Sequence, residues 1–544
     1  MGREKTIVLI FPPLTMPTSP PLGISMLKSY IGRELPEWRV KVLDLNIWTF
    51  DVLLNSLHRG RFLNSTYFPE GALGEIALAN IKEVFRGRND SEFYGAPDHY
   101  EVYADLLLRF VEVYSQTIAN LCRSFEQGGA LHPLLQLMLD SIMVEQPDCI
   151  GISLSFSQQV ACGSLLGSLL RKQYGIKVIL GGSVFTDSAR EFMTLHPSAA
   201  DYVVVGEGED ALKQLLMNLD TPENAPGTSY WRDGIIKENE PAIRTDIDHF
   251  PPPDFSDLNL KHYYSPEPVI PLLLSRGCHW RKCVFCVHYR SAGHTFRMHS
   301  MEYVIAMLKE LVSQGIRNFA FIDEMISPKH FEMLSRAITD AQLDISYYAL
   351  AKPIQQFTPE LLKLISASGC KYIIWGVESG SQRILDLMEK GTTVTGISGV
   401  LRSASAVGIA NHLYIMCGFP TETIDEFAST IRFLDEHKDC IYAVHRGTFA
   451  LEKKSKVFEE PDKFGITSVR LVKEDAFGGR WEYECSSGMT TDQTKLQFQN
   501  MLPFLRAFSP FTVRLANFRD HALLVYGKGG QFIHPEQRVF PPVF

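Results

Sequence analysis

The chain lacks the long apolar runs of membrane proteins and the excess of positive charge that is common in nucleic-acid-binding proteins. No stretch of the 544 residues approaches the about 18 uninterrupted apolar residues that indicate a transmembrane helix. The formal net charge is −9, which gives no electrostatic reason to expect a nucleic acid as the main partner. We therefore expect a protein with no membrane span and no nucleic-acid partner.

Cysteine is also scarce, with ten residues in the whole chain. A disulfide framework would spread its cysteines through a small secreted domain, whereas here Cys278, Cys283 and Cys286 lie within nine residues and the other seven are scattered. The apolar run at residues 7–11 is too short for the core of a signal peptide. These features predict a cytoplasmic protein in which the three clustered thiols form a metal site.

The first part of the chain has the pattern of an α/β fold. Apolar strand patterns alternate with helical spacing, at residues 6–11, 40–45, 148–154, 177–180 and 202–205. This alternation predicts a doubly wound, Rossmann-like parallel sheet with helices on both faces, over residues 1–225. Residues at about 51–147 interrupt the pattern with mostly helical spacing, and we interpret them as a helical insertion that packs on this domain.

A second alternating region follows a polar segment. Residues 226–264 include three consecutive prolines and predict a linker. Further strand patterns then alternate with helical spacing, at residues 269–275, 318–322, 346–350, 372–377 and 412–417. They predict a partial (β/α) barrel over residues 265–440, shorter than the full eight-fold barrel. We expect a small mixed C-terminal domain at 441–544, with a strand-like run at 522–526.

The three clustered cysteines follow a predicted strand on one loop. Thiolates are soft ligands suited to iron–sulfur clusters and to zinc. Three of them can bind three corners of a [4Fe-4S] cube and leave the fourth iron open to a substrate. A structural zinc site requires a fourth protein ligand, and His279 and His288 are close enough in sequence to provide it. The spacing alone favours the cluster but leaves both interpretations open.

The residues around this loop resemble the radical S-adenosylmethionine (SAM) superfamily. The aromatic Phe285 directly before the last cysteine is typical of its signature loop, although four residues separate Cys278 from Cys283 where the family usually has three. Three later segments resemble, in the expected order, motifs of the cobalamin-type and methylthio-type members. They are the acidic strand end at 323–324 (DE), the segment at 376–381 (GVESGS) and the turn at 418–423 (GFPTET).

The resemblance implies a set of contacts to SAM, whose amino and carboxylate groups chelate the open iron in this family. We expect them from Phe285, Lys352, Glu378 and Ser379. Phe285 would pack on the adenine, Lys352 would face the carboxylate, and Glu378 with Ser379 would bind the ribose or methionine end. The alternatives are core packing for Phe285, a solvated charge for Lys352 and a helix N-terminal partner for Glu378. For Asp323, a strand-end cap is an alternative to a ligand contact.

The N-terminal domain resembles the cobalamin-binding domain of the B12-dependent radical SAM class. Ligands of such folds lie at the carboxyl ends of the strands, and glycines there let the backbone approach a bulky cofactor, although they could also be ordinary turns. The residues expected to contact cobalamin are Pro13, Leu22, Ser153, Ser155, Gly182, Ser183, Gly206 and Glu207. The loop at residues 12–23 contains no histidine, so we expect cobalamin without a histidine ligand from this loop.

The resemblance implies an enzyme that uses a [4Fe-4S] cluster, SAM and cobalamin. Its 5′-deoxyadenosyl radical would abstract hydrogen from an unactivated carbon, and methylcobalamin would donate a methyl group. We therefore expect a C-methyltransferase acting on a small natural product or a peptide, with an electron donor such as flavodoxin or ferredoxin. One alternative is a radical oxidation, rearrangement or cyclisation with the same cofactors. The other is a zinc-bearing binding protein without catalysis.

Overall fold

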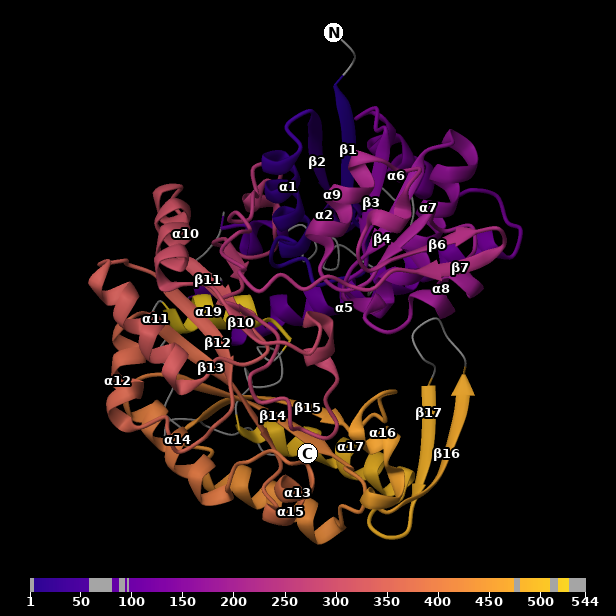
Figure 1. Cartoon of the computed structure of the whole chain (residues 1–544). Coiled ribbons are helices and arrows are strands. Elements are labelled where there is room, and N and C mark those ends of the chain that lie inside the picture. Colours follow the sequence, from indigo (N-terminus) through magenta and orange to yellow (C-terminus); the bar gives the residue numbers. More distant parts are fainter. Residues whose placement is uncertain are drawn as a thin grey trace.

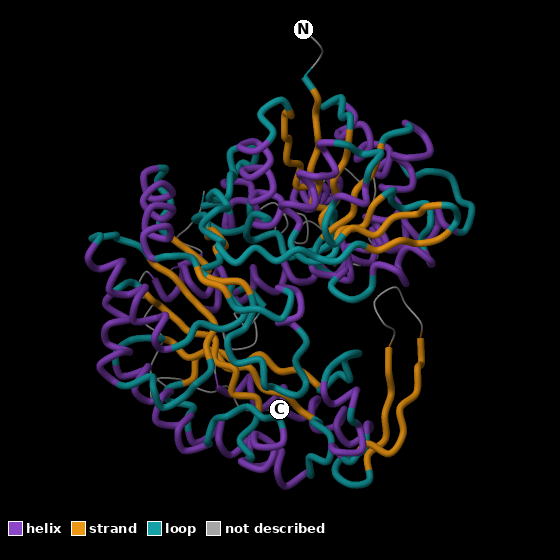
Figure 2. The backbone as a smooth tube through the Cα atoms, in the orientation of Figure 1, coloured by secondary structure: helices purple, strands orange, loops and turns teal. Residues whose placement is uncertain are grey.

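The structure, a computed structural model, describes residues 4–57, 81–87, 93–94, 97–473, 480–508 and 517–527. Two α/β bodies lie next to each other, the first from indigo to magenta and the second from red to orange (Figure 1). Strands form the centre of each body, and helices surround them (Figure 2). Among the described helices, none combines the length and apolar character that a membrane crossing requires.

The first body is built on a seven-stranded sheet with the order β2-β1-β3-β4-β5-β6-β7. The first five strands are parallel, and the order 2-1-3-4-5 is that of the flavodoxin-like doubly wound folds. This confirms the predicted fold class. The strands are β1 (Lys5–Phe11), β2 (Trp38–Asp44), β3 (Cys149–Ser153), β4 (Lys177–Gly181), β5 (Tyr202–Val204), β6 (Thr228–Arg232) and β7 (Ile235–Glu238).

Both faces of this sheet are buried, which explains the continuous apolar runs of its strands. Val8 and Ile10 of β1 pack into one core, while Ile7 and Leu9 pack into the core on the opposite face. The helices α1 (Leu22–Glu34) and α9 (Gly208–Met217) cover the second core. The first core is covered by α2 (Leu45–Leu57), α5 (Pro97–Glu126), α6 (Pro133–Met143), α7 (Val160–Tyr174) and α8 (Ala189–Leu195).

The structure differs from the predicted linker at 226–264. Residues 228–238 form the antiparallel pair β6 and β7, which extends the first sheet beyond β5. Tyr230 and Ile236 are buried, while most of their neighbours on these strands are exposed. With only five and four residues, the two strands are too short to show a clear alternating pattern in the sequence.

The second body is a partial barrel of six parallel strands in the order β15-β14-β13-β12-β11-β8. This confirms the predicted partial (β/α) barrel. β15 lies beyond the predicted boundary at residue 440. The strands are β8 (Val269–Leu272), β11 (Asn318–Phe321), β12 (Ser346–Ala351), β13 (Cys370–Glu378), β14 (Ala410–Cys417) and β15 (Ile441–Thr448).

Helices cover the outer face of this sheet (Figure 1). Most of them begin at a serine or threonine whose hydroxyl accepts a hydrogen bond from a backbone N–H of the first turn, such as Ser300, Thr358 and Thr423. The helices are α10 (Met301–Ser313), α11 (Pro328–Asp340), α12 (Pro359–Ala367), α13 (Gln382–Leu387), α14 (Val394–Ala406) and α15 (Ile424–Glu436).

The inner face of the partial barrel packs against α19 (Arg519–Gly527), a helix from the C-terminal region. The predicted strand-like run at 522–526 is therefore wrong. Residues 522–525 are all buried because the helix is enclosed on all sides, and a continuous apolar run cannot distinguish such a helix from a buried strand. The same region also contains the antiparallel pair β16 (Ile466–Lys473) and β17 (Arg480–Cys485), and α17 (Thr491–Phe508).

Candidate active site

A cavity of about 1100 Å³ lies between the two sheets, at the carboxyl ends of both sets of strands. The first sheet contributes strand-end residues such as Phe11, Ser153 and Gly181, and the second contributes Leu273 and Ile322. Ligand pockets for drug-sized molecules usually measure roughly 300–1,000 Å³. The cavity is thus large enough for a bulky cofactor, and it lies where doubly wound folds bind their ligands.

The wall formed by the first sheet is mostly backbone. Gly182 has a φ of 113°, and a Cβ at this position would lie 2.2 Å from the carbonyl oxygen of Leu154. Gly206 has a φ of 81°, a backbone conformation that residues other than glycine rarely adopt. The hydroxyl of Ser183 donates to the carbonyl of Ser155 at 2.9 Å and so ties the two turns together. These turns leave open space beside main-chain groups, which fits a large cofactor such as cobalamin.

Seven of the eight residues predicted to contact cobalamin line this cavity, namely Leu22, Ser153, Ser155, Gly182, Ser183, Gly206 and Glu207. The eighth, Pro13, is not among the lining residues.

The cysteine loop begins at a turn that requires glycine. Gly277 has a φ of 86°, and a Cβ there would lie 2.0 Å from the carbonyl oxygen of Thr295. Further along, the N–H of Val284 donates to the carbonyl of Met388, and the carbonyl of Val284 accepts from the N–H of Val457. The loop is thereby fixed directly after Cys283. All three clustered cysteines are half-buried and free of disulfide bonds.

The electrostatic surroundings of the thiols fit a cluster site. Burial raises the pKa of Cys283, and it raises that of Cys286 to about 12, with the charges of Cys283 and Cys278 contributing. With raised pKa values these two thiols keep their protons at neutral pH unless a bound metal displaces the protons. The positive charges of Lys390 and Lys352 act in the opposite direction on Cys283 and favour its thiolate.

The donors near the cysteine loop can be compared with those of a zinc site. Over the described residues, no three Cys, His, Asp or Glu side chains converge on one ion. Thiolates that bind three different irons of a cube stand farther apart than the ligands of one ion. His279, a predicted alternative ligand, lies edge-on to Phe296 with ring centroids 5.7 Å apart, and burial lowers its pKa. Three thiolates on one loop are a donor set that suits an iron–sulfur cluster.

A chain of buried charges runs beside the cysteine loop. Nζ of Lys352 lies 3.0 Å from the centroid of the Trp280 ring and donates to the carbonyl of Lys390 at 3.1 Å. Nζ of Lys390 donates in turn to Oε1 of Glu378 at 2.7 Å. Burial lowers the pKa of Lys352 to about 8. Lys352 is therefore not a solvated surface charge, and Lys390 is a site residue that the sequence pattern did not reveal.

Glu378 is held in a strained conformation at the end of β13. Its φ is 68°, in the left-handed region that residues other than glycine seldom occupy. The centroid of the Phe285 ring lies 6.0 Å from Nζ of Lys390. Three of the predicted SAM contacts, Phe285, Lys352 and Glu378, therefore lie around this lysine. Ser379 differs, because its buried hydroxyl bonds with the Thr430 hydroxyl at 3.3 Å and accepts from the N–H of Ser381. It shapes the turn.

Asp323 takes the strand-end role that was one of its two interpretations. Its fully buried carboxylate accepts hydrogen bonds from the N–H of Leu274 and the hydroxyl of Ser275. Burial raises its pKa to about 6. The next residue, Glu324, lines the cavity. Asp323 therefore fixes the chain just before the cysteine loop.

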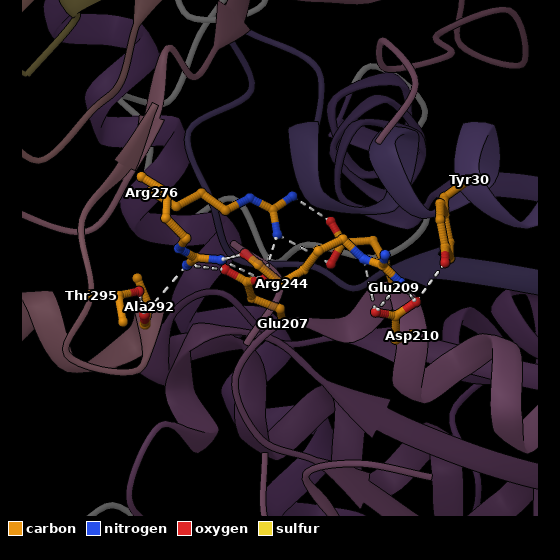
Figure 3. A network of polar contacts seen from close by, with 9 residues as sticks. Tyr30, Glu207, Glu209, Asp210, Arg244, Arg276, Ala292 and Thr295 are labelled. Atoms are coloured by element: carbon orange, nitrogen blue, oxygen red, sulfur yellow. Dashed lines mark hydrogen bonds and ion pairs between the residues drawn. The ribbon is translucent and has the colours of Figure 1, made fainter. Parts of the chain in front are cut away.

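An ion-pair network joins the cysteine loop to the first body (Figure 3). Buried Arg276 donates to Glu209 at 2.5 Å and pairs with Glu207 at 3.2 Å. Arg297 also donates to Glu207. Glu207, predicted as a cobalamin contact, thus binds two arginines of the second body as well as lining the cavity. Nothing in the local sequence signals this long-range pairing.

Family models match both halves of this arrangement. The model of the radical SAM superfamily matches residues 272–434, and the model of the B12 binding domain matches residues 132–216. The chain belongs to the cobalamin-dependent radical SAM enzymes. For a member of this family, the first match implies SAM and a [4Fe-4S] cluster, and the second implies cobalamin.

Curated relatives of this cobalamin-dependent radical SAM enzyme include methyltransferases. The chain is 29% identical to the uncharacterized methyltransferase PH0819 of Pyrococcus horikoshii, over 53% of this chain and 64% of the relative. It is 25% identical to the bacteriochlorophyllide d C-12(1)-methyltransferase of Chlorobaculum tepidum, over 48% and 55%. The match thus spans less than two thirds of the length of either relative.

Solved structures support the fold of both bodies together. The cobalamin-dependent radical enzyme OxsB, with aqua-cobalamin and SAM bound, superposes with a TM-score of 0.64 at 15% identity, covering 93% of this chain and 67% of OxsB. The radical SAM methyltransferase TsrM of Kitasatospora setae gives a TM-score of 0.60 at 14% identity, covering 93% and 89%. The likeness therefore covers the order and packing of the two domains.

Proposed function

We propose that this enzyme is a C-methyltransferase that methylates an unactivated carbon of a natural-product or peptide substrate. The observation that carries the proposal is the cavity between the two sheets. Gly277, at the start of the cysteine loop, lines the cavity on one side, and the glycine turns of the B12-binding domain line it on the other. A substrate in this cavity would lie between the two cofactors. The methyltransferases among the relatives support this reading.

The residues of the chain would mainly position groups and exclude water. When bound, the cluster and SAM supply a 5′-deoxyadenosyl radical, and cobalamin supplies methyl transfer. Cys278, Cys283 and Cys286 would hold the cluster. The paired charges of Lys390 and Glu378 would face the carboxylate and amino groups of SAM. Because the cavity lies between two packed bodies, its walls would limit the access of water to a reactive radical.

The reaction also requires an electron and a reducing environment. We propose a small electron carrier such as flavodoxin or ferredoxin as the donor, and a cytoplasmic location. Support for the location comes from the cysteines, all ten of which are free, including seven outside the cluster loop.

A second candidate function is a radical cyclisation or rearrangement with the same cofactors. It is favoured by two relatives of other activity, an anaerobic magnesium-protoporphyrin IX monomethyl ester cyclase at 27% identity and a 4'-phospho-dehydrooxetanocin synthase at 23% identity. The cavity and the cysteine loop would serve either reaction.

Product mass separates the two candidates. The anaerobically reconstituted enzyme is incubated with a reductant, SAM labelled with deuterium in its methyl group, and a panel of candidate substrates. Methylation predicts a product heavier by one CH₂ and carrying deuterium. A product of unchanged or dehydrogenated skeleton without deuterium would reject methylation and support the second candidate.

A further inference from the structure

The cavity ends in a polar floor inside the partial barrel. Four residues form this floor, and all of them line the cavity: Tyr348 of β12, His445 of β15, and Arg519 and Asp520 at the start of α19. The floor belongs to the barrel and α19, whereas the glycine turns predicted to meet cobalamin belong to the first body. It is therefore a region of the cavity that the three cofactors do not account for.

Arg519 is the positive charge of the floor. Within the described residues, its guanidinium makes one hydrogen bond, to the hydroxyl of Tyr414, and forms no ion pair with a carboxylate. The guanidinium carbon lies 5.5 Å from the centroid of the Tyr414 ring. Because a guanidinium carries five N–H donors, most of them remain available to a ligand in the cavity. A half-buried guanidinium that forms no direct ion pair with a carboxylate favours binding of an anion in the cavity.

The neighbouring Asp520 forms no direct ion pair with Arg519 among the described residues, although the two charges attract each other. Its carboxylate accepts from the hydroxyl of Thr18 at 2.6 Å and from the hydroxyl of Tyr348 at 3.4 Å. It is fully buried, and burial raises its pKa above the ordinary value. The two hydroxyls therefore engage Asp520 separately, and Arg519 keeps an unpaired positive charge facing the cavity.

A second observation beside the floor also indicates a missing polar partner. His412 is 1% exposed, and both of its ring nitrogens lack a hydrogen-bond partner. Its ring lies edge-on to that of Tyr414, with centroids 5.9 Å apart, and burial lowers its pKa, with the charge of Arg519 acting in the same direction. His412 is not itself among the residues that line the cavity, but it lies next to Tyr414, the hydrogen-bond partner of Arg519. Buried polar groups without partners are rare in folded proteins. The polar groups around Arg519 thus have more hydrogen-bonding capacity than the protein itself satisfies.

We propose that Arg519 binds an oxyanion of the substrate, either a carboxylate or a phosphate, at the floor of the cavity. A planar guanidinium matches both groups through paired N–H donors. The bound oxyanion anchors the substrate in the barrel. The rest of the substrate then points toward the wall formed by the first sheet, with its turns at Gly182 and Gly206. That this ligand is the substrate rests on the proposed function. The oxyanion site itself stands on Arg519 and its surroundings.

The test is calorimetric titration of the holoenzyme. Anaerobic enzyme loaded with cluster, cobalamin and SAM is titrated with inorganic phosphate in one series and with glutarate in another. The wild type is expected to bind at least one of them, and the preferred anion identifies the substrate group. Arg519→Met should weaken that binding about tenfold or more, while Arg519→Lys retains part of it. The matched control is Arg402→Gln, an exposed arginine of α14 paired with Asp439, which should bind like the wild type.

Two results would overturn the site: wild-type holoenzyme that binds neither anion, or Arg519→Met that binds the preferred anion as tightly as Arg519→Lys and the wild type. Cobalamin content and circular dichroism check that each variant is folded. SAM cleavage is measured on the same wild-type sample. Enzyme that binds the anion through Arg519 but cleaves no SAM would reject the proposed function and retain the oxyanion site.

Discussion

The seven-stranded sheet and the six-stranded sheet both direct the carboxyl ends of their strands toward one cavity, but they line it with different parts of the chain. The first sheet presents backbone at turns such as those of Gly182 and Gly206. The barrel lines it with the residues that lead into the thiol loop, Ser275 to Gly277, while the cysteines and the charged pair of Lys390 and Glu378 are not among the lining residues. A bulky cofactor requires space, whereas a cluster and SAM require donors and charges. Adding atoms should therefore damage the first wall, and removing groups should damage the second.

The largest effect is expected at the thiol loop. Cys283→Ala removes one of the three proposed cluster ligands, and we expect loss of the cluster and of SAM cleavage by about a thousandfold or more. The measurement is iron content together with 5′-deoxyadenosine formation. Cys440→Ala, outside the loop, is the control and should keep its iron. Full SAM cleavage by the Cys283 variant would remove this residue from the cluster site.

The link between the two walls should give the next largest effect. Arg276→Ala leaves Glu207 and Glu209 buried without this partner, and we expect a loss of about 3–5 kcal/mol in the free energy of unfolding. Arg190→Ala breaks a more exposed pair with Glu238 and should cost about 1 kcal/mol or less. Thermal unfolding of both variants gives the comparison. Equal small losses would mean that the network does not hold the two bodies together.

On the glycine wall, a single added methyl group should be harmful. Gly182→Ala places a Cβ against the backbone of Leu154 at an unfavourable φ, with an expected cost of about 3 kcal/mol and weaker cobalamin binding. Gly32→Ala is the matched control, because nothing lies within 4 Å of its added Cβ and the position is helical. Cobalamin retention after gel filtration measures the effect. Iron content should stay normal in both variants.

The smallest effect concerns a buried carboxylate in the turn after β14. Glu422 is 1% exposed, and burial raises its pKa from 4.5 to about 7. Because the folded protein binds this proton more tightly than the unfolded chain, the stability falls as the pH rises from about 4.5 to 7. Glu422→Gln lacks this titration, so at pH about 8 it should be more stable than the wild type by up to about 3 kcal/mol. The difference should vanish near pH about 4. A constant difference across this range would contradict the assignment.

The sequence predicted those parts of the fold that depend on local pattern. The continuous apolar run at the start of β1 follows from burial on both faces of a parallel sheet, and the same pattern located the strands of the barrel. It could not distinguish α19 from a strand, because full enclosure removes the helical period. The short antiparallel pair β6 and β7 has too few buried residues to be recognised.

The candidate site also contains residues that a local sequence pattern reveals and residues that it does not. The three cysteines and Glu378 occur in recognisable segments, so spacing and resemblance identified them. Lys390 reaches Glu378 across twelve residues, and Arg276 pairs with carboxylates more than sixty residues earlier. The first pairing is determined by the fold of the barrel and the second by how the two bodies pack, and a local pattern carries no information about either.

The most direct test of the account is the cofactor content of the wild-type protein purified without oxygen. We expect about four iron atoms, an equal number of sulfide ions and one cobalamin for each chain. The absorption spectrum should contain the bands of both cofactors. One zinc ion for each chain, with neither iron nor cobalamin after reconstitution, would contradict the account.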